Sequence, residues 1–173
     1  MAGLQLPNPP PTTPAVRNVM RANRARDTGP ERRLRRALRE AGLGGYRLNW
    51  KKAPGRPDIA YPGRRIAIFV HGCYWHHCPR CYPTMPKSNP EFWARKFELN
   101  RERDARKRVR LEAGGWAVLE TWEHELLGDV AVVVEKVARL TRRRGRLADS
   151  SPRASIGPTE RSLGPTSRLE SHK

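Results

Sequence analysis

Long apolar segments are absent from this chain of 173 residues. A transmembrane helix needs roughly 20 consecutive apolar residues, and a secretory signal needs a shorter apolar core near the N-terminus. Neither feature is present in the sequence. We therefore expect a protein without a membrane span, located in the cytosol.

Acidic residues are also scarce. The chain has 17 Asp and Glu residues against 35 Lys and Arg, which gives a formal net charge of +18 and a pI near 11.2. This excess favours a polyanionic partner, because each neutralised phosphate releases condensed counterions. A genome rich in G and C would also favour arginine, but it would not explain the shortage of acids. Nucleic acid is therefore the favoured partner.

Cysteine is rare as well, and the three cysteines lie together between Cys73 and Cys81. This distribution excludes a disulfide framework and, in a cytosolic chain, favours metal ligands or a reactive thiol. Metal-free buried cysteines are a weaker alternative, because the three lie so close together. A catalytic cysteine is weaker still, since no base is obviously paired with a thiol.

The composition divides the chain into three parts. Residues 1–17 are rich in proline and polar residues and are predicted to be disordered. Residues 18–142 show the apolar periodicity of one folded domain. Residues 143–173 are small, polar and basic, so they cannot bury enough apolar surface to become ordered, and we expect a disordered tail.

Three segments have helical patterns. The first helix is predicted to be capped by Asp27 or Thr28 and to have Pro30 in its first turn. Its apolar stripe consists of Leu34, Leu38 and Ala41. The second helix runs from Glu91 to about Ala113, and its predicted buried face consists of Trp93, Phe97, Val109 and Leu111. The third occupies residues 129–140, with an apolar face of Val130, Val134, Val137 and Leu140.

Strand-like patterns occupy residues 46–50, 57–61, 64–70 and 116–122. Pro62-Gly63 separates the second and third of them and predicts a hairpin. The order of elements indicates an α/β fold with a mixed β-sheet flanked by helices. The tryptophans expected in its core or sheet packing are Trp50, Trp93, Trp116 and Trp122.

The cysteine spacing C-x4-C-x2-C predicts a zinc site. Cys78 and Cys81 have the two-residue separation that lets two thiolates bind one Zn²⁺ ion. A tetrahedral site needs a fourth ligand, but His76 and His77 lie inside the tight loop between cysteines. The fourth ligand is therefore expected from elsewhere in the chain.

His124 is the predicted fourth ligand, since it directly follows the strand of residues 116–122. If that strand lies beside the one that ends at Val70, His124 reaches the cysteines. The predicted ligands are then Cys73, Cys78, Cys81 and His124. Four protein ligands leave no open position, so this zinc would be structural.

Three acids lie at the ends of predicted elements. Asp58 opens a strand in GRPDIA, Asp104 lies in NRERD on the second helix, and Glu31 begins the first helix. A strand with an early aspartate, a hairpin and an apolar strand together form the skeleton of many Mg²⁺-dependent nucleases. Taken singly, each acid has an ordinary explanation, as a turn residue, an ion-pair partner or a helix-dipole acid.

Several separated motifs resemble, in order, those of the very-short-patch repair (Vsr-type) DNA mismatch endonucleases. They are PDIAY, IAIFVHGCYWHHC, PKSNPEFWARKFELNRERD and GWAVLETWEHE, and the likeness covers Val19 to about Leu126. The resemblance implies a restriction-endonuclease-like core with a structural zinc. It also implies a Mg²⁺-dependent enzyme that nicks DNA 5′ to the thymine of a T:G mismatch, the lesion left when 5-methylcytosine deaminates.

The same resemblance implies roles for five residues of this sequence. Asp58 corresponds to the principal Mg²⁺ ligand, helped by the backbone carbonyl of Val70. His76 corresponds to the catalytic histidine and Asp104 to its carboxylate partner. Glu31 corresponds to an acid that reaches metal-bound waters.

The expected DNA contacts come from two groups. Met20, Tyr74 and Trp75 match side chains that wedge into the base stack beside the mismatch. A basic arm before the first helix is expected to contact phosphates, unless it is merely solvated. Its basic residues are Arg17, Arg21, Arg24 and Arg26.

The chain departs from the family's pattern at several positions. Tyr74 stands where the family often has phenylalanine. Cys78 and Cys81 stand, with altered spacing, where the best-known members have His and Cys, and His124 stands where they have Cys or sometimes His. His71 stands where related nucleases carry a lysine, so it is either an active-site neighbour or a strand-end histidine bonded to backbone.

The implied partner is double-stranded DNA with a T:G mismatch, in the cytosol of a bacterium. Other repair proteins are a further partner class, and a monomer is sufficient for a single nick. Two alternatives stay open: a non-catalytic zinc-containing DNA-binding module, and a related nuclease that cuts matched or modified DNA. The catalytic-type residues argue against the first, while the second is poorly separated, since kinship of fold does not fix the substrate.

Overall fold

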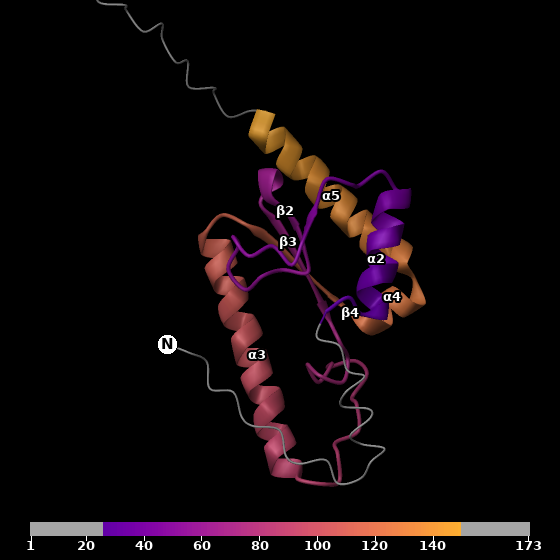
Figure 1. Cartoon of the computed structure of the whole chain (residues 1–173), viewed down its shortest axis with the longest axis vertical. Helices are drawn as coiled ribbons and strands as arrows, with labels where there is room; N and C mark the ends of the chain where they lie inside the picture. Colours follow the sequence, from indigo (N-terminus) through magenta and orange to yellow (C-terminus); the bar gives the residue numbers. More distant parts are fainter. Residues whose placement is uncertain (1–25, 150–173) are drawn as a thin grey trace, which may run out of the picture.

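The computed structural model describes residues 26–149, with the side chains of residues 146–149 left out. Within this range the chain forms one mixed β-sheet with α-helices on both faces (Figure 1). None of its helices is both long and apolar enough to span a membrane. The predicted DNA contacts Arg17, Met20, Arg21 and Arg24 lie outside the described residues, as does the segment 1–17.

The sheet has the strand order β1-β2-β3-β4. Its strands are β1 (Arg47–Leu48), β2 (Ile59–Tyr61), β3 (Ile66–His71) and β4 (Ala117–Trp122). The first two neighbouring pairs are antiparallel, and β3 pairs with β4 in parallel. The predicted mixed sheet is thus confirmed, and His71 lies opposite Trp122 at its edge.

The predicted hairpin between β2 and β3 is confirmed, with a short 3₁₀ helix, η1 (Pro62–Arg64), as its connection. Pro62 suits the first position of such a turn because its φ is already fixed. Arg65 closes the turn in the left-handed region, with a φ of 50°. Tyr61 and Ile66, on either side of the turn, are register partners.

Helix α2 (Gly29–Glu40) begins at the N-cap Thr28, one of the two predicted caps. Thr28 and Glu31 form a reciprocal capping box, which satisfies backbone N–H groups of the first turn. Leu34 and Leu38 are fully buried, as predicted. Ala41 is exposed, and its place in the apolar stripe was wrong because the helix has already ended at this C-cap position.

Helix α3 (Pro90–Ala113) occupies the predicted range. Trp93, Phe97 and Leu111 are buried. Val109 is 63% exposed, so its assignment to the buried face was wrong. Two residues of helix correspond to about 200° of rotation, which places Val109 on the side opposite Leu111.

Helix α4 (Glu123–Gly128) was not predicted, because six residues are too few to show helical periodicity. Helix α5 (Val130–Asp149) extends well beyond the predicted end at Leu140. Residues 143–149, predicted to belong to a disordered tail, are therefore helical. The segment contains Arg, Leu and Ala, which are good helix formers. The rest of the predicted tail, residues 150–173, lies outside the described residues.

Two apolar layers hold the sheet between its helices. Strand β3 alternates, so Ile66 and Ile68 join the cluster shared with α2, α4 and α5, while Ala67 and Phe69 join the other. The first cluster consists of Leu34, Leu38, Ile59, Tyr61, Ile66, Ile68, Leu126, Val133 and Val137. The second consists of Ala53, Ala67, Phe69 and Leu111, with Trp50 and Trp116 against it. Helix α3 lies on the second face, opposite α2 and α5 (Figure 1).

Candidate functional site

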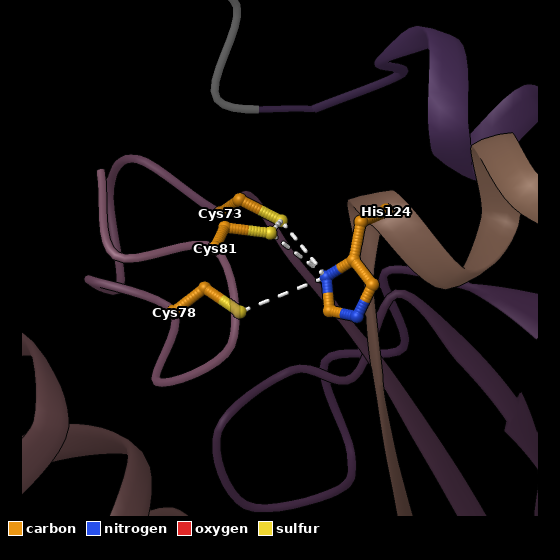
Figure 2. A group of neighbouring side chains, drawn as sticks. All are labelled: Cys73, Cys78, Cys81 and His124. Atoms are coloured by element: carbon orange, nitrogen blue, oxygen red, sulfur yellow. Dashed lines mark hydrogen bonds between the residues drawn. The ribbon is translucent and has the colours of Figure 1, made fainter. Parts of the chain in front are cut away.

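Three sulfur atoms and one imidazole converge beyond the adjacent ends of β3 and β4 (Figure 2). The residues are Cys73, Cys78, Cys81 and His124. His124 Nδ1 lies 3.3 Å from the Cys73 and Cys81 sulfurs and 3.6 Å from the Cys78 sulfur. The sulfurs of Cys73 and Cys81 are themselves 3.6 Å apart.

These separations fit a tetrahedral zinc ion. With Zn–S bonds of about 2.3 Å and Zn–N bonds of about 2.0 Å, the edges of the tetrahedron are about 3.8 Å between sulfurs and about 3.5 Å from sulfur to nitrogen. Burial, together with the neighbouring thiols Cys81 and Cys78, raises the pKa of the Cys73 thiol to about 12. A divalent cation would supply the charge that three converging thiolates need. The predicted four residues thus form a group that could hold zinc.

The parallel pairing of β3 and β4 explains how distant residues meet there. Cys73 follows the end of β3 and His124 follows the end of β4, and strand ends in a parallel pair lie at the same edge. Glu123 tightens this junction, because its Oε2 accepts a hydrogen bond from the backbone N–H of Cys73 at 3.2 Å. The backbone N–H of Cys78 also donates to the carbonyl of Cys73 at 2.9 Å, which closes the loop.

A second cluster lies beside the first and contains His71, His76 and Asp104, whose ligand atoms all lie within 4.8 Å of one another. His76 Nδ1 lies 2.6 Å from Asp104 Oδ2, and His71 Nδ1 lies 3.9 Å from the same oxygen. The two imidazole rings are 4.4 Å apart. The structure therefore brings the predicted pair of His76 and Asp104 together, with His71 as their buried neighbour.

Asp104 is held as a carboxylate. Burial raises the pKa of this group, but the hydrogen bonds and charges of His76 and Lys107 outweigh burial and lower it below its usual range. An ionised carboxylate can only accept hydrogen bonds, so His76 Nδ1 carries the proton of their shared bond. The other ring nitrogen, Nε2, is then the one that remains for proton exchange in a neutral ring.

Asp58 immediately precedes β2 and is linked to β3. Its Oδ2 accepts a hydrogen bond of 2.8 Å from the backbone N–H of Val70. Burial and the negative charge of Glu31 raise the pKa of Asp58 to about 6, against the opposing effects of that bond, His71 and Lys107. Asp58 and Val70 are therefore adjacent, and the bond between them uses the N–H of Val70, not the carbonyl predicted to bind Mg²⁺.

Glu31 has a structural role at the start of α2. Its carboxylate accepts hydrogen bonds from the backbone N–H of Asp27 at 3.0 Å and from the hydroxyl of Thr28 at 2.9 Å. The residue is 5% exposed. Its charge nevertheless reaches Asp58, so the start of α2 and the start of β2 share one electrostatic environment.

The aromatic pair Tyr74 and Trp75 is half-buried against α3. The Tyr74 ring packs edge-on against Phe97, at 5.9 Å, and the Trp75 ring lies 6.2 Å from Trp93. Asn100 also donates a hydrogen bond of 2.9 Å to the carbonyl of Trp75. Arg26, the first described residue, is exposed.

Sequence reasoning missed two charged residues of the second cluster. Lys107 Nζ lies 3.0 Å from Asp104 Oδ1, and its position one helical turn after Asp104 was a signal that could have found it. Glu120 Oε1 lies 3.8 Å from His71 Nε2, and Glu120 also pairs with Arg108. Glu120 gave no such signal, because its contact depends on the pairing of β3 with β4.

The chain is similar to DNA-cutting enzymes. A family model described as DNA mismatch endonuclease Vsr matches residues 12–82. The type II nicking enzyme V.XorIIP of Xanthomonas oryzae pv. oryzae is 43% identical over 110 residues, covering 64% of this chain and 80% of that enzyme. The DNA mismatch endonuclease Vsr of Escherichia coli is 44% identical over 110 residues, covering 63% and 69%. The type II nicking enzyme V.NaeI of Lentzea aerocolonigenes is 38% identical over 138 residues, covering 76% and 82%.

Proposed function

This chain belongs to the Vsr family of DNA mismatch endonucleases, and we propose that it nicks one DNA strand 5′ to the thymine of a T:G mismatch. The reaction would be Mg²⁺-dependent hydrolysis of a phosphodiester bond, on the lesion that deamination of 5-methylcytosine leaves. One relative bears the name of a DNA mismatch endonuclease and others are named type II nicking enzymes, so both names describe enzymes that cut nucleic-acid strands.

The surroundings of Asp58 fit a hard cation. Its half-buried carboxylate has a pKa raised to about 6, which means that the negative charge lacks sufficient positive compensation in the protein alone. Mg²⁺ prefers oxygen ligands, and Asp58 together with the carbonyl of Val70 would hold it. Bound there, the ion would supply positive charge beside the scissile phosphate. Glu31 would contact water bound to it.

His76 would move the proton that hydrolysis requires. Its Nδ1 is engaged by Asp104, which sets the tautomer and leaves Nε2 to accept a proton from water or donate one to the leaving oxygen. Imidazole exchanges protons near neutral pH, and a fixed orientation raises the fraction of productive encounters. His71 packs against His76 and would help to keep its ring in place.

Tyr74 and Trp75 would enter the base stack beside the mismatch. Both are anchored to α3 but remain partly exposed, so they could stack on DNA without losing their support. Partial unstacking costs least where pairing is already weak. The zinc group would fix the loop that carries both aromatics and His76. The exposed Arg101 and Arg103, next to Asp104 on α3, supply charge for the phosphates.

The observation that carries this proposal is the convergence of separate motifs at the end of β3. Asp58 is bonded to Val70 within that strand, and His76 in the following loop is bonded to Asp104 from α3. A carboxylate that favours a cation thus lies in the same charged environment as an oriented histidine, since His71 contacts Asp104 and also affects Asp58. This combination fits metal-assisted hydrolysis better than DNA binding alone.

The test uses end-labelled duplexes that are identical except for one T:G or T:A pair. With Mg²⁺, wild type is expected to cut one strand, 5′ to the mismatched thymine, and to leave the matched duplex intact. Asp58→Asn, which keeps the shape and the acceptor for Val70, should bind DNA but not cut it. Equal cutting by both proteins would overturn the role of Asp58.

Two other outcomes would favour the alternatives. Tight binding to the mismatch without scission at any Mg²⁺ concentration would indicate a non-catalytic DNA-binding module. Cleavage of both strands of a fully paired or modified duplex would indicate a related nuclease with a different substrate. The nick position distinguishes these from the proposed reaction, because only a single cut at the mismatched thymine matches it.

A further inference from the structure

Lys107 contacts three residues along the length of its side chain, which are Asp104, Phe69 and Gly55. Its Nζ lies 3.0 Å from Asp104 Oδ1 and 5.7 Å from the centre of the Phe69 ring. Its stem packs against Gly55, where an added Cβ would come within 2.9 Å of Lys107 Cβ and Cδ and within 2.7 Å of Cγ. The glycine, with a φ of +74°, therefore leaves the space that this stem occupies.

Lys107 completes the set of partners around Asp104. The oxygen Oδ2 accepts a bond from His76, and the oxygen Oδ1 accepts one from Lys107. The torsion that orients an aspartate carboxylate is soft, so a single bond from His76 would leave the group free to rotate. Partners on both oxygens fix its plane, and hence the direction in which it holds the imidazole.

We propose that Lys107 is a positioning residue, which fixes Asp104 so that Asp104 in turn fixes the ring and tautomer of His76. This role rests on the proposed function, in which His76 moves the reacting proton. Outer partners that orient metal-ligating residues typically contribute about 10- to 100-fold to activity, and we expect a loss of the same order here. Within residues 26–149, Lys107 bonds to Asp104 and forms no hydrogen bond with His76 or with the predicted zinc ligands.

The first experiment compares two substitutions that keep the stem. Lys107→Met preserves its volume against Gly55 but removes the charge, whereas Lys107→Arg preserves the Cβ, Cγ and Cδ atoms and the charge. Under single-turnover conditions with saturating protein, the Met variant should nick about 10- to 100-fold more slowly, with DNA affinity changed little. The Arg variant should recover most of the rate. The control is Arg106→Met, which removes an exposed cation from the preceding position of α3. This variant should nick at close to the wild-type rate.

A double variant tests whether Lys107 acts through Asp104. In an Asp104→Asn background, Lys107→Met should cause no further loss, because the group that it orients has already been altered. A further loss of tenfold would overturn the proposal and indicate direct contact with the substrate. Lys107→Gln serves in the same design if the Met variant does not fold.

A spectroscopic measurement separates this inference from the proposed function. The His76 Nδ1–H proton should give a protected downfield NMR signal in DNA-free wild type and in Lys107→Arg, and the signal should be lost or shifted in Lys107→Met. If wild type cuts no duplex but the signals follow this pattern, the proposed function fails and Lys107 keeps its positioning role. If wild type nicks and Lys107→Met retains both rate and signal, the positioning role is overturned and the function stands.

Discussion

Two clusters of ligand-type side chains share the segment between β3 and α3, yet they are built in opposite ways. The zinc-type cluster, which consists of Cys73, Cys78, Cys81 and His124, takes three of its four residues from one short loop and is rich in sulfur. The His71–His76–Asp104 cluster combines a strand, a loop and a helix, and charged residues on α3 and β4 adjoin it. The first could be closed by one ion, whereas the second has the proposed role of moving a proton through His76.

The two clusters show how one short loop can be fixed in place and still carry the proposed catalytic histidine, His76. His76 lies between Cys73 and Cys78, so an ion on the cysteines would fix the backbone from which the histidine projects. Asp104 then fixes the side chain from the other side. The backbone of His76 would thus be fixed by the cysteine loop and its ring by Asp104, so substitutions can remove each of these interactions separately.

Removing the reactive group should have the largest effect. His76→Ala is expected to lower the single-turnover nicking rate by about 10²- to 10⁴-fold, the usual contribution of general acid–base catalysis. Zinc content and DNA affinity should be unchanged. His77→Ala, whose ring packs against Phe97, is the matched control and should retain most of the rate. A fully active His76→Ala protein would remove the distinction between the two clusters.

Removing the zinc ion should mainly lower the stability of the fold. If free zinc is about 1,000 times its Kd, chelation should lower the free energy of unfolding by about 4 kcal/mol, and Cys78→Ala should mimic it. Wild type should release about one equivalent of zinc per chain, as detected by a colorimetric indicator during unfolding. A metal-free wild type with the same unfolding midpoint would show that the cysteines do not form a structural zinc site.

The two carboxylates of the reactive region should respond to pH with opposite signs. The pKa of Asp58 is about 6 in the folded protein and 3.8 in its reference state, so its stabilising contribution is complete below about pH 4 and is lost as pH rises through 6. In Mg²⁺-free protein at pH 7, Asp58→Asn should therefore increase stability, by up to about 3 kcal/mol. The gain should vanish at pH 4.

Asp104 supplies the contrast, because its pKa is lowered in the folded protein. Its contribution is present above its reference pKa and is lost as pH falls, so Asp104→Asn should reduce stability at pH 7. Urea unfolding of wild type and both variants at pH 4 and pH 7 measures these effects. Changes of the same sign for both variants at pH 7 would contradict the opposite electrostatic environments.

The smallest expected effect concerns recognition. Trp75→Ala should reduce the preference for T:G over T:A duplexes by about 1–3 kcal/mol, the usual contribution of one stacked aromatic. Tyr82→Ala is the control, since Tyr82 is 77% exposed just after the cysteine loop and has no predicted role. Affinities for both duplexes are measured by fluorescence anisotropy. Equal losses on the two duplexes would reject the wedge and leave Trp75 as a support for the loop.

Much of the fold could be predicted because its signals are local. The capping residues Thr28 and Glu31, the Pro62 turn and the apolar run of β3 each act over a few residues. Helix α4 was not predicted because it is short. Val109 was wrongly predicted to be buried because apolar periodicity is weak over a long, charged helix. The end of α5 was predicted too early, because the helix propensity of the residues after Leu140 outweighed their polar composition.

The sequence by itself determined the three cysteines of the zinc-type group, since they follow from their spacing, whereas His124 joins them only through the pairing of β3 with β4. Only the tertiary structure decided the further neighbours of the second cluster and of Asp58. Lys107 reaches Asp104, Glu120 faces His71, and Glu31 influences Asp58, because separate elements pack against one strand. The physical reason is that burial and the distances between charges set the pKa values, and both quantities exist only once the layers have assembled.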